Sequence, residues 1–66
     1  MESFMIRQVM AQKNIRVSDI AKMVGVSHVA VLHVINFRSK SERISQAVAA
    51  AIDLPVSEVF PDKEAA

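Results

Sequence analysis

The 66-residue sequence contains no cysteine, tryptophan or tyrosine, and only one glycine and two prolines. Without cysteine the chain forms neither disulfides nor thiolate metal sites, which agrees with a reducing compartment. Its apolar runs are far shorter than the roughly 20 residues that a membrane-spanning helix needs. Its first residues also lack the apolar core of a signal peptide. We therefore expect a cytoplasmic protein with no membrane segment.

The length of the chain leaves room for one small domain and no second core. Residues 1–61 are predicted to form this domain, and residues 62–66 a frayed C-terminal tail. A domain of this size without disulfides depends on efficient helix packing or on self-association. We expect both.

Apolar residues recur at helical spacing along the whole chain, which predicts an all-α fold of five helices. The predicted helices cover residues 3–13, 18–24, 27–36, a segment that follows Ser39 and ends before Asp53, and a short stretch from Pro55 to Phe60. Short connections between them predict a compact bundle.

The boundaries of these helices carry local signals. Asn14 and Gly25 are predicted to end the first two helices, because both residue types tolerate the left-handed conformation. Ser27 is expected to cap the third helix with its hydroxyl. The pattern Ser39-x-x-Glu42 predicts a capping box at the start of the fourth.

The third predicted helix has two chemically different faces at about 100° per residue. One face is small and apolar and comprises Ser27, Ala30, Val31 and Val34. The other comprises His28, Val29, Leu32, His33 and Asn36. Imidazole, amide and short aliphatic groups suit base edges and thymine methyl groups. The two helices around Gly25 therefore predict a helix-turn-helix that reads double-stranded DNA.

Charge is distributed unevenly along the chain, although the net charge is only +1. Residues 1–43 contain seven lysines and arginines against three acidic residues, whereas residues 44–66 contain one against four. A basic front and an acidic back would orient the domain towards a polyanion. The alternative, an ordinary solvated surface, stays open on charge alone.

The segment from Asp19 to Asn36 resembles the helix-turn-helix of the phage repressor and Cro family, the λ-repressor-like or XRE-type domains. The resemblance rests on Asp19-Ile20-Ala21, Gly25-Val26-Ser27, Val31, Val34 and Asn36. Residues 44–61 are similar to the last two helices of such domains, so the resemblance spans about residues 4–61. It implies a compact five-helix domain and a sequence-specific transcriptional regulator, a repressor of phage or prophage type.

By position, the resemblance also implies contacts with DNA. Base contacts would come from Ser27, His28, Val29, Leu32 and His33. Phosphate contacts would come from Val17, Ser18, Asn36, Arg38, Ser39 and Lys40. Two residues depart from the family pattern: Val17 stands where glutamine is common, and Met10 where arginine is frequent. Contact at the start of the second helix is therefore expected from Ser18 or from backbone N–H groups.

Several of these residues have a plainer alternative. His28 and His33 are separated by about 140° around a helix, so they do not form an i, i+4 metal pair, and no metal site is expected. The alternative to base contact for each histidine is an exposed side chain without a role. The alternative for Val29 and Leu32 is a wider buried stripe or a dimer seam.

Val56, Val59 and Phe60 form a short apolar stripe near the end of the chain. It either closes the core of the monomer or forms a two-fold dimer contact, and the sequence leaves both open. Specific binding normally uses two half-sites about 34 Å apart, so we expect a homodimer, at least on DNA. For Arg38 and Lys40 the alternative to phosphate binding is a merely solubilising loop.

Other functions are less well supported by the sequence. A helix-turn-helix that serves as a protein-interaction module, as part of a larger regulatory complex, remains an alternative. No nucleophile–base pair, phosphate-binding glycine loop or paired carboxylates appear, so no enzymatic activity is expected. Neither a cofactor nor a small-molecule ligand is expected.

Overall fold

Five helices form within residues 1–61, the part of the chain that the computed structural model describes. They are α1 (Ser3–Gln12), α2 (Val17–Val24), α3 (His28–Ile35), α4 (Glu42–Ala51) and α5 (Val56–Val59). These residues contain no β-strand, so the all-α prediction is confirmed. The predicted frayed tail, residues 62–66, lies outside the described residues.

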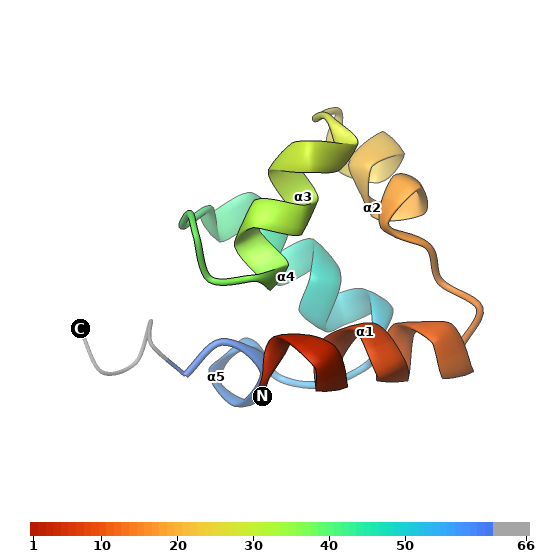
Figure 1. Cartoon of the computed structure of the whole chain (residues 1–66), viewed down its shortest axis with the longest axis vertical. Helices are drawn as coiled ribbons and strands as arrows, with labels where there is room; N and C mark the ends of the chain where they lie inside the picture. The colour runs from red at the N-terminus through yellow and green to blue at the C-terminus, as the bar shows by residue number, and fades with distance from the viewer. Residues whose placement is uncertain (62–66) are drawn as a thin grey trace.

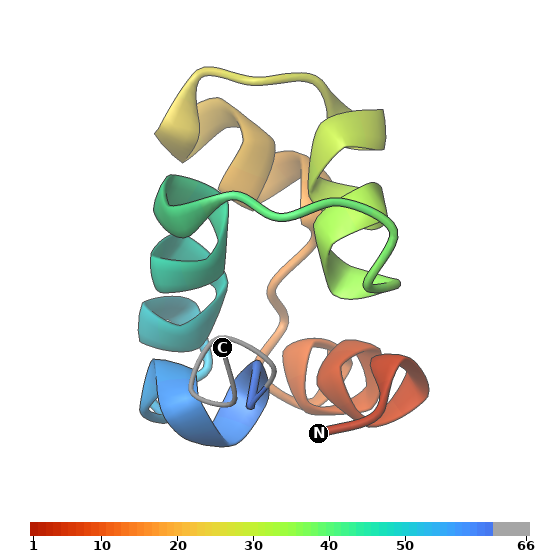
Figure 2. The ribbon, with the colours of Figure 1, turned by 90° about the vertical axis from the view of Figure 1, so that its left-hand side faces the viewer.

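The helices form two sides of a bundle (Figures 1 and 2). α1 and α3 lie at the front in Figure 1, α4 runs behind them, and α5 lies beside the N-terminal end of α1. α2 and α3 follow one another with a bend of 112° between them. Neither these nor the other helices within residues 1–61 are individually long and apolar enough to cross a membrane; only the bent α2–α3 pair together reaches that length and composition.

All five helices contribute to one apolar core. Its buried side chains are Ile6, Met10, Ile20, Ala21, Val31, Val34, Ile35, Ile44, Val48, Ala49, Ile52, Val59 and Phe60. Three of them, Val31, Val34 and Ile35, line the back of α3. The sequence predicts the packing position of Val31 and Val34 and places Ile35 on neither face. Burying side chains of this size contributes about 1.5–3 kcal/mol each, so the back of α3 is a main source of stability.

Serine hydroxyls cap two of the helices. Ser27 Oγ accepts a hydrogen bond from the Ala30 N–H at 3.1 Å, as predicted. The predicted cap of the fourth helix at Ser39 is wrong. Ser41 Oγ accepts from the Ile44 N–H at 3.3 Å, and α4 begins one residue later at Glu42. Both serines lie shortly before the helix, and the path of the preceding loop brings only Ser41 to the first turn.

Four helices end at a residue in the left-handed conformation: Asn14 (φ 59°), Gly25 (φ 81°), Phe37 (φ 61°) and Asp53 (φ 62°). The predictions for Asn14 and Gly25 are confirmed. After each of these four residues, the next N–H donates back to the helix: Ile15 N–H to Met10 O (2.8 Å), Val26 N–H to Ala21 O (3.0 Å), Arg38 N–H to His33 O (2.8 Å) and Leu54 N–H to Ala49 O (3.0 Å). This pairing satisfies carbonyl groups that a helix end otherwise leaves free.

The short α5 closes one end of the core. Val59 and Phe60 are 0% and 3% exposed, while Val56 is half-buried. Of the two alternatives left open by the sequence, core closure is therefore the one observed. The dimer contact predicted at Val59 and Phe60 is corrected accordingly, because neither side chain has appreciable surface to offer a second copy.

Candidate nucleic-acid interface

The outer face of α3 is polar and accessible. His28, Val29 and His33 are exposed, Val29 at 55%, and Leu32 is half-buried. Ser27, which caps the helix, is exposed as well. Four of the five residues expected to read bases thus lie on accessible surface, and the fifth lies at its edge.

Two side chains from other helices tie down the ends of α2 and α3. Ser3 Oγ donates to the Ile35 carbonyl at the end of α3 (2.9 Å), and Arg43 Nη2 donates to the Val24 carbonyl at the end of α2 (2.9 Å). Each bond satisfies a carbonyl that has no partner within its own helix. α3 is thereby attached to α1 at one end, and α2 to α4.

The loop after α3 folds back onto that helix. The N–H groups of Arg38 and Ser39 both donate to the His33 carbonyl, at 2.8 and 3.3 Å. Asn36 is half-buried, whereas Arg38, Ser39 and Lys40 are exposed. The loop therefore places two cationic side chains at the C-terminal end of α3.

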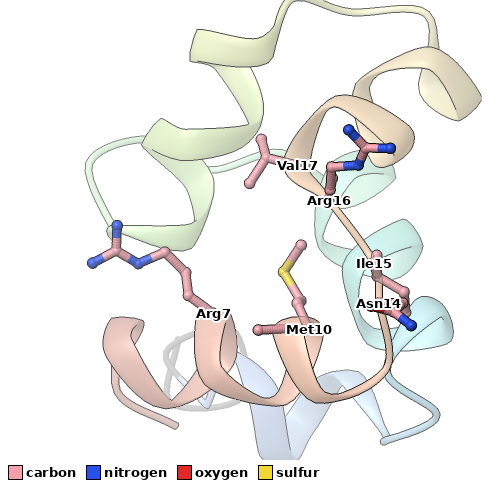
Figure 3. Close-up of a pocket in the computed structure, with 7 residues that line it drawn as sticks. Arg7, Met10, Asn14, Ile15, Arg16 and Val17 are labelled. Atoms are coloured by element: carbon pink, nitrogen blue, oxygen red, sulfur yellow. The ribbon is translucent and has the colours of Figure 1, made fainter.

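A cleft of about 590 Å³ lies between the second half of α1 and the start of α2 (Figure 3). It is lined by Arg7, Met10, Ala11, Asn14, Ile15, Arg16 and Val17. Arg7 and Arg16 lie on opposite sides of the cleft, with Met10 and Val17 between them. The result is an apolar floor with a guanidinium group on either side.

The start of α2 forms one wall of this cleft. Val17, the first residue of the helix, is half-buried and lines the cleft. Ser18, which follows it, is also half-buried. The Arg16 N–H donates a hydrogen bond to Asp19 Oδ2 at 2.9 Å. The first N–H groups of a helix have no partner within the helix. Those groups and the helix dipole both favour an anion at this end.

The cationic side chains around α3 are not neutralised within residues 1–61. The structure shows no ion pair between described residues for Arg7, Arg16, Arg38 or Lys40. In Figure 1 the loop of residues 36–41 lies to the left of α3, and the start of α2 to its right. The backbone that carries Arg38 and Lys40 therefore lies on one side of α3, and the start of α2, which follows Arg16, lies on the other.

Sequence reasoning counted Arg7 and Arg16 only as part of the basic front half. A signal for the cleft was present, because Arg7 lies three residues before Met10 and four before Ala11, so that the three share one stripe of α1. Nothing in that spacing reveals that the start of α2 lies opposite the stripe. The cleft itself was therefore missed.

The two histidines do not belong to a metal cluster within the described residues. No group of three or more histidine, cysteine, aspartate or glutamate side chains there is placed to hold a metal ion. His28 and His33 contribute imidazole groups to the outer face of α3.

Comparison of the chain with protein-family models, with curated protein sequences and with solved structures finds no match.

Proposed function

We propose that this protein is a sequence-specific DNA-binding transcriptional regulator in which α2 and α3 act as a helix-turn-helix. α3, about 12 Å long for its eight residues at 1.5 Å per residue, would enter the major groove, which is about 12 Å wide. Ser27, His28, Val29, Leu32 and His33 would face the base edges.

One observation carries the proposal: α3 is buried along its back and accessible along a front that is flanked by unpaired cations. The front mixes hydrogen-bonding imidazoles with the aliphatic Val29, which suits both base edges and thymine methyl groups.

Phosphate contacts would come from both flanks of α3. On one side, Asn36, Arg38, Ser39 and Lys40 would hold the DNA backbone, and on the other the start of α2 at Val17 and Ser18. Arg7 and Arg16 extend this second contact, because their cleft opens beside the positive end of α2. Such contacts set the register of the protein on the duplex without reading sequence.

As a regulator, the protein would act by occupying an operator and excluding polymerase or a competing factor. Repression and the phage type, which the family resemblance of residues 19–36 implies, form part of the proposal. So does a cytoplasmic location, which the lack of cysteine and of a signal-peptide core favours. A homodimer on DNA also belongs to it, since one α3 covers only one half-site.

A protein-interaction module is the second candidate. It is supported by the exposure of Met23 (68%) and Val29 (55%), two apolar side chains of α2 and α3. Salt separates the two candidates. Binding through Z phosphates weakens with a log–log slope near −0.9Z, whereas an apolar protein contact does not weaken in this way.

Selection from random DNA duplexes by the purified chain, at low and at moderate salt, tests the proposal. We expect a short inverted repeat whose half-sites lie about one helical turn apart. Enrichment of no sequence at either salt concentration would contradict sequence-specific reading and favour the interaction module.

A further inference from the structure

Phe37 follows α3 in the left-handed conformation, with a φ of 61°. Asn14, Gly25 and Asp53 adopt the same conformation at other helix ends, and their residue types tolerate it. Phenylalanine does not, because its side chain is large and has no short polar group to bond the local backbone. A residue in such a conformation persists only where the surrounding structure holds it. A contact from elsewhere in the chain therefore fixes Phe37.

The side chain that contacts the ring of Phe37 is Phe60. The two rings meet edge to face, with centroids 5.8 Å apart and an interplanar angle of 69°. Phe60 is 3% exposed and belongs to the core, whereas Phe37 is 40% exposed. An aromatic contact of this kind stabilises by an amount similar to the cost of the left-handed conformation. The contact therefore offsets the backbone strain, and its result is a defined path of the chain after α3.

That path places the loop which follows α3. Directly after Phe37, the N–H groups of Arg38 and Ser39 donate to the His33 carbonyl, at 2.8 and 3.3 Å. A left-handed residue at the helix end is what turns the next N–H groups back towards the helix. Arg38, Ser39 and Lys40 are exposed and are the loop residues proposed to hold phosphate. The backbone of this loop is thus positioned by the conformation of the residue before it.

We infer that Phe60, through Phe37, positions the loop of residues 38–40 for contact with the DNA backbone. The inference rests on the proposed function, because phosphate binding by this loop is part of it. Ordering a loop on binding costs affinity, so a loop that is already held in place binds phosphate more tightly. Phe37 and Phe60 are positioning residues, which act through Arg38 and Lys40. A core residue at the end of α5 thereby contributes to recognition at the end of α3.

Four substitutions separate the ring contact from the backbone strain. F37A removes the ring and keeps the cost of the left-handed conformation, so the loop should open. F37G removes the ring and the cost together, so the left-handed helix end should form again. F60L keeps an apolar side chain in the core and removes the aromatic partner. F37Y retains the ring and is the conservative variant.

D53A is the matched control for F37A. It places alanine at another left-handed helix end, after α4, where φ is 62°. It therefore carries the same backbone cost but removes neither ring of the aromatic pair. An effect of strained helix ends in general appears in both alanine variants, whereas an effect of the ring contact appears in F37A alone.

The first measurement is amide hydrogen exchange without DNA, followed by NMR at Arg38 and Ser39. The Ile35 N–H within α3 is the reference, because its exchange reports opening of the helix and of the whole domain. Relative to this reference, F37A and F60L should speed exchange at Arg38 and Ser39 about tenfold, through loss of one aromatic contact. F37Y and D53A should stay within about twofold of the wild type. F37G should exchange at least about threefold more slowly than F37A.

Two results of this measurement would overturn the inference. One is exchange at Arg38 and Ser39 that neither F37A nor F60L speeds relative to Ile35. The other is equal acceleration in F37A and D53A, because the ring contact would then have no part in it.

The second measurement is binding to the selected duplex at several salt concentrations. F37A should lower the affinity and flatten the salt slope by about one to two, because each phosphate contact contributes roughly 0.9. F37G should recover part of the slope and F37Y all of it. A wild-type slope in F37A, with the loop open by exchange, would overturn the inference and leave the proposed function standing. A wild type that binds no duplex would instead contradict the proposed function, and the exchange rates would then decide whether Phe60 fixes the loop.

Discussion

The two faces of α3 show how one short helix serves stability and recognition at once. Its back, with Val31, Val34 and Ile35, has at most 2% of each side chain exposed, whereas Val29 on its front is 55% exposed. Both faces contain aliphatic side chains, so hydropathy alone does not distinguish them. The position of each residue around the helix, and the cations on its flanks, distinguish the face that packs from the face that is free to bind.

The largest difference between the two faces is expected in the free energy of unfolding when a buried side chain is removed from the back of α3. Ile35→Ala should lower the free energy of unfolding by about 2–4 kcal/mol, because it leaves a cavity in a filled core. Val29→Ala, an aliphatic truncation on the front, should change it by less than about 0.5 kcal/mol. Urea denaturation of both variants measures the difference, and equal losses would contradict the assignment of the two faces.

Removing the two arginines of the cleft tests their proposed phosphate contacts without changing the residues of α3 that are proposed to contact bases. Arg7→Gln combined with Arg16→Gln should lower affinity at least about tenfold and make the salt slope shallower by about two, because each lost phosphate contact removes roughly 0.9 from it. Titrations of one duplex at several salt concentrations measure both quantities.

The matched control for the cleft is Lys13→Gln combined with Lys22→Gln, which removes the same charge from exposed residues that do not line the cleft. Its slope should change by less than half as much as that of the arginine pair. Equal changes in both double variants would indicate that net charge, rather than the cleft, carries the effect.

Ser27 links the two faces, because it caps α3 and is also proposed to touch a base. Ser27→Ala should cost about 1 kcal/mol of stability through loss of the bond to the Ala30 N–H. Ser39→Ala should cost almost nothing, because Ser39 is exposed and caps no helix. Thermal unfolding compares the two, and a larger loss at Ser39 would restore the capping box predicted from the sequence.

The smallest effect is expected from a substitution on the front of α3. It concerns the preferred base rather than the free energy of unfolding. His28→Ala should change the base preferred at one position of each half-site by about 1 kcal/mol and leave the salt slope unaltered. Arg38→Gln should instead weaken all sequences alike and flatten the slope by about one. Selection repeated with each variant separates the two outcomes, and the same loss on every duplex from both would refute this division of roles.

Local signals in the sequence predicted most of the fold. Ser27 caps α3, Asn14 and Gly25 end their helices, and Val31 and Val34 face the core, because each depends on a helical turn or on a backbone conformation that the residue itself favours. The error at Ser39 has a local cause too. Two serines lie within reach of the same helix start, and sequence spacing does not choose between them.

Phe37 marks the limit of such reasoning. No local preference predicts an aromatic residue at a left-handed helix end, and its conformation becomes understandable only beside Phe60. Val59 and Phe60 illustrate the same limit, since a short apolar stripe suits a core and a dimer contact equally well until its neighbours are known.

The sequence by itself determined the five helices, most of their ends and the two-sided character of α3, because those features arise from interactions within a few residues. Only the tertiary structure decided which stripe closes the core, which arginines lie on either side of the cleft and which apolar groups remain exposed beside the start of α1. The physical reason is that these surfaces join residues far apart in the chain, such as Arg7 with Arg16 and Met5 with Phe37. Their proximity is set by how the helices pack, and no local pattern carries that information.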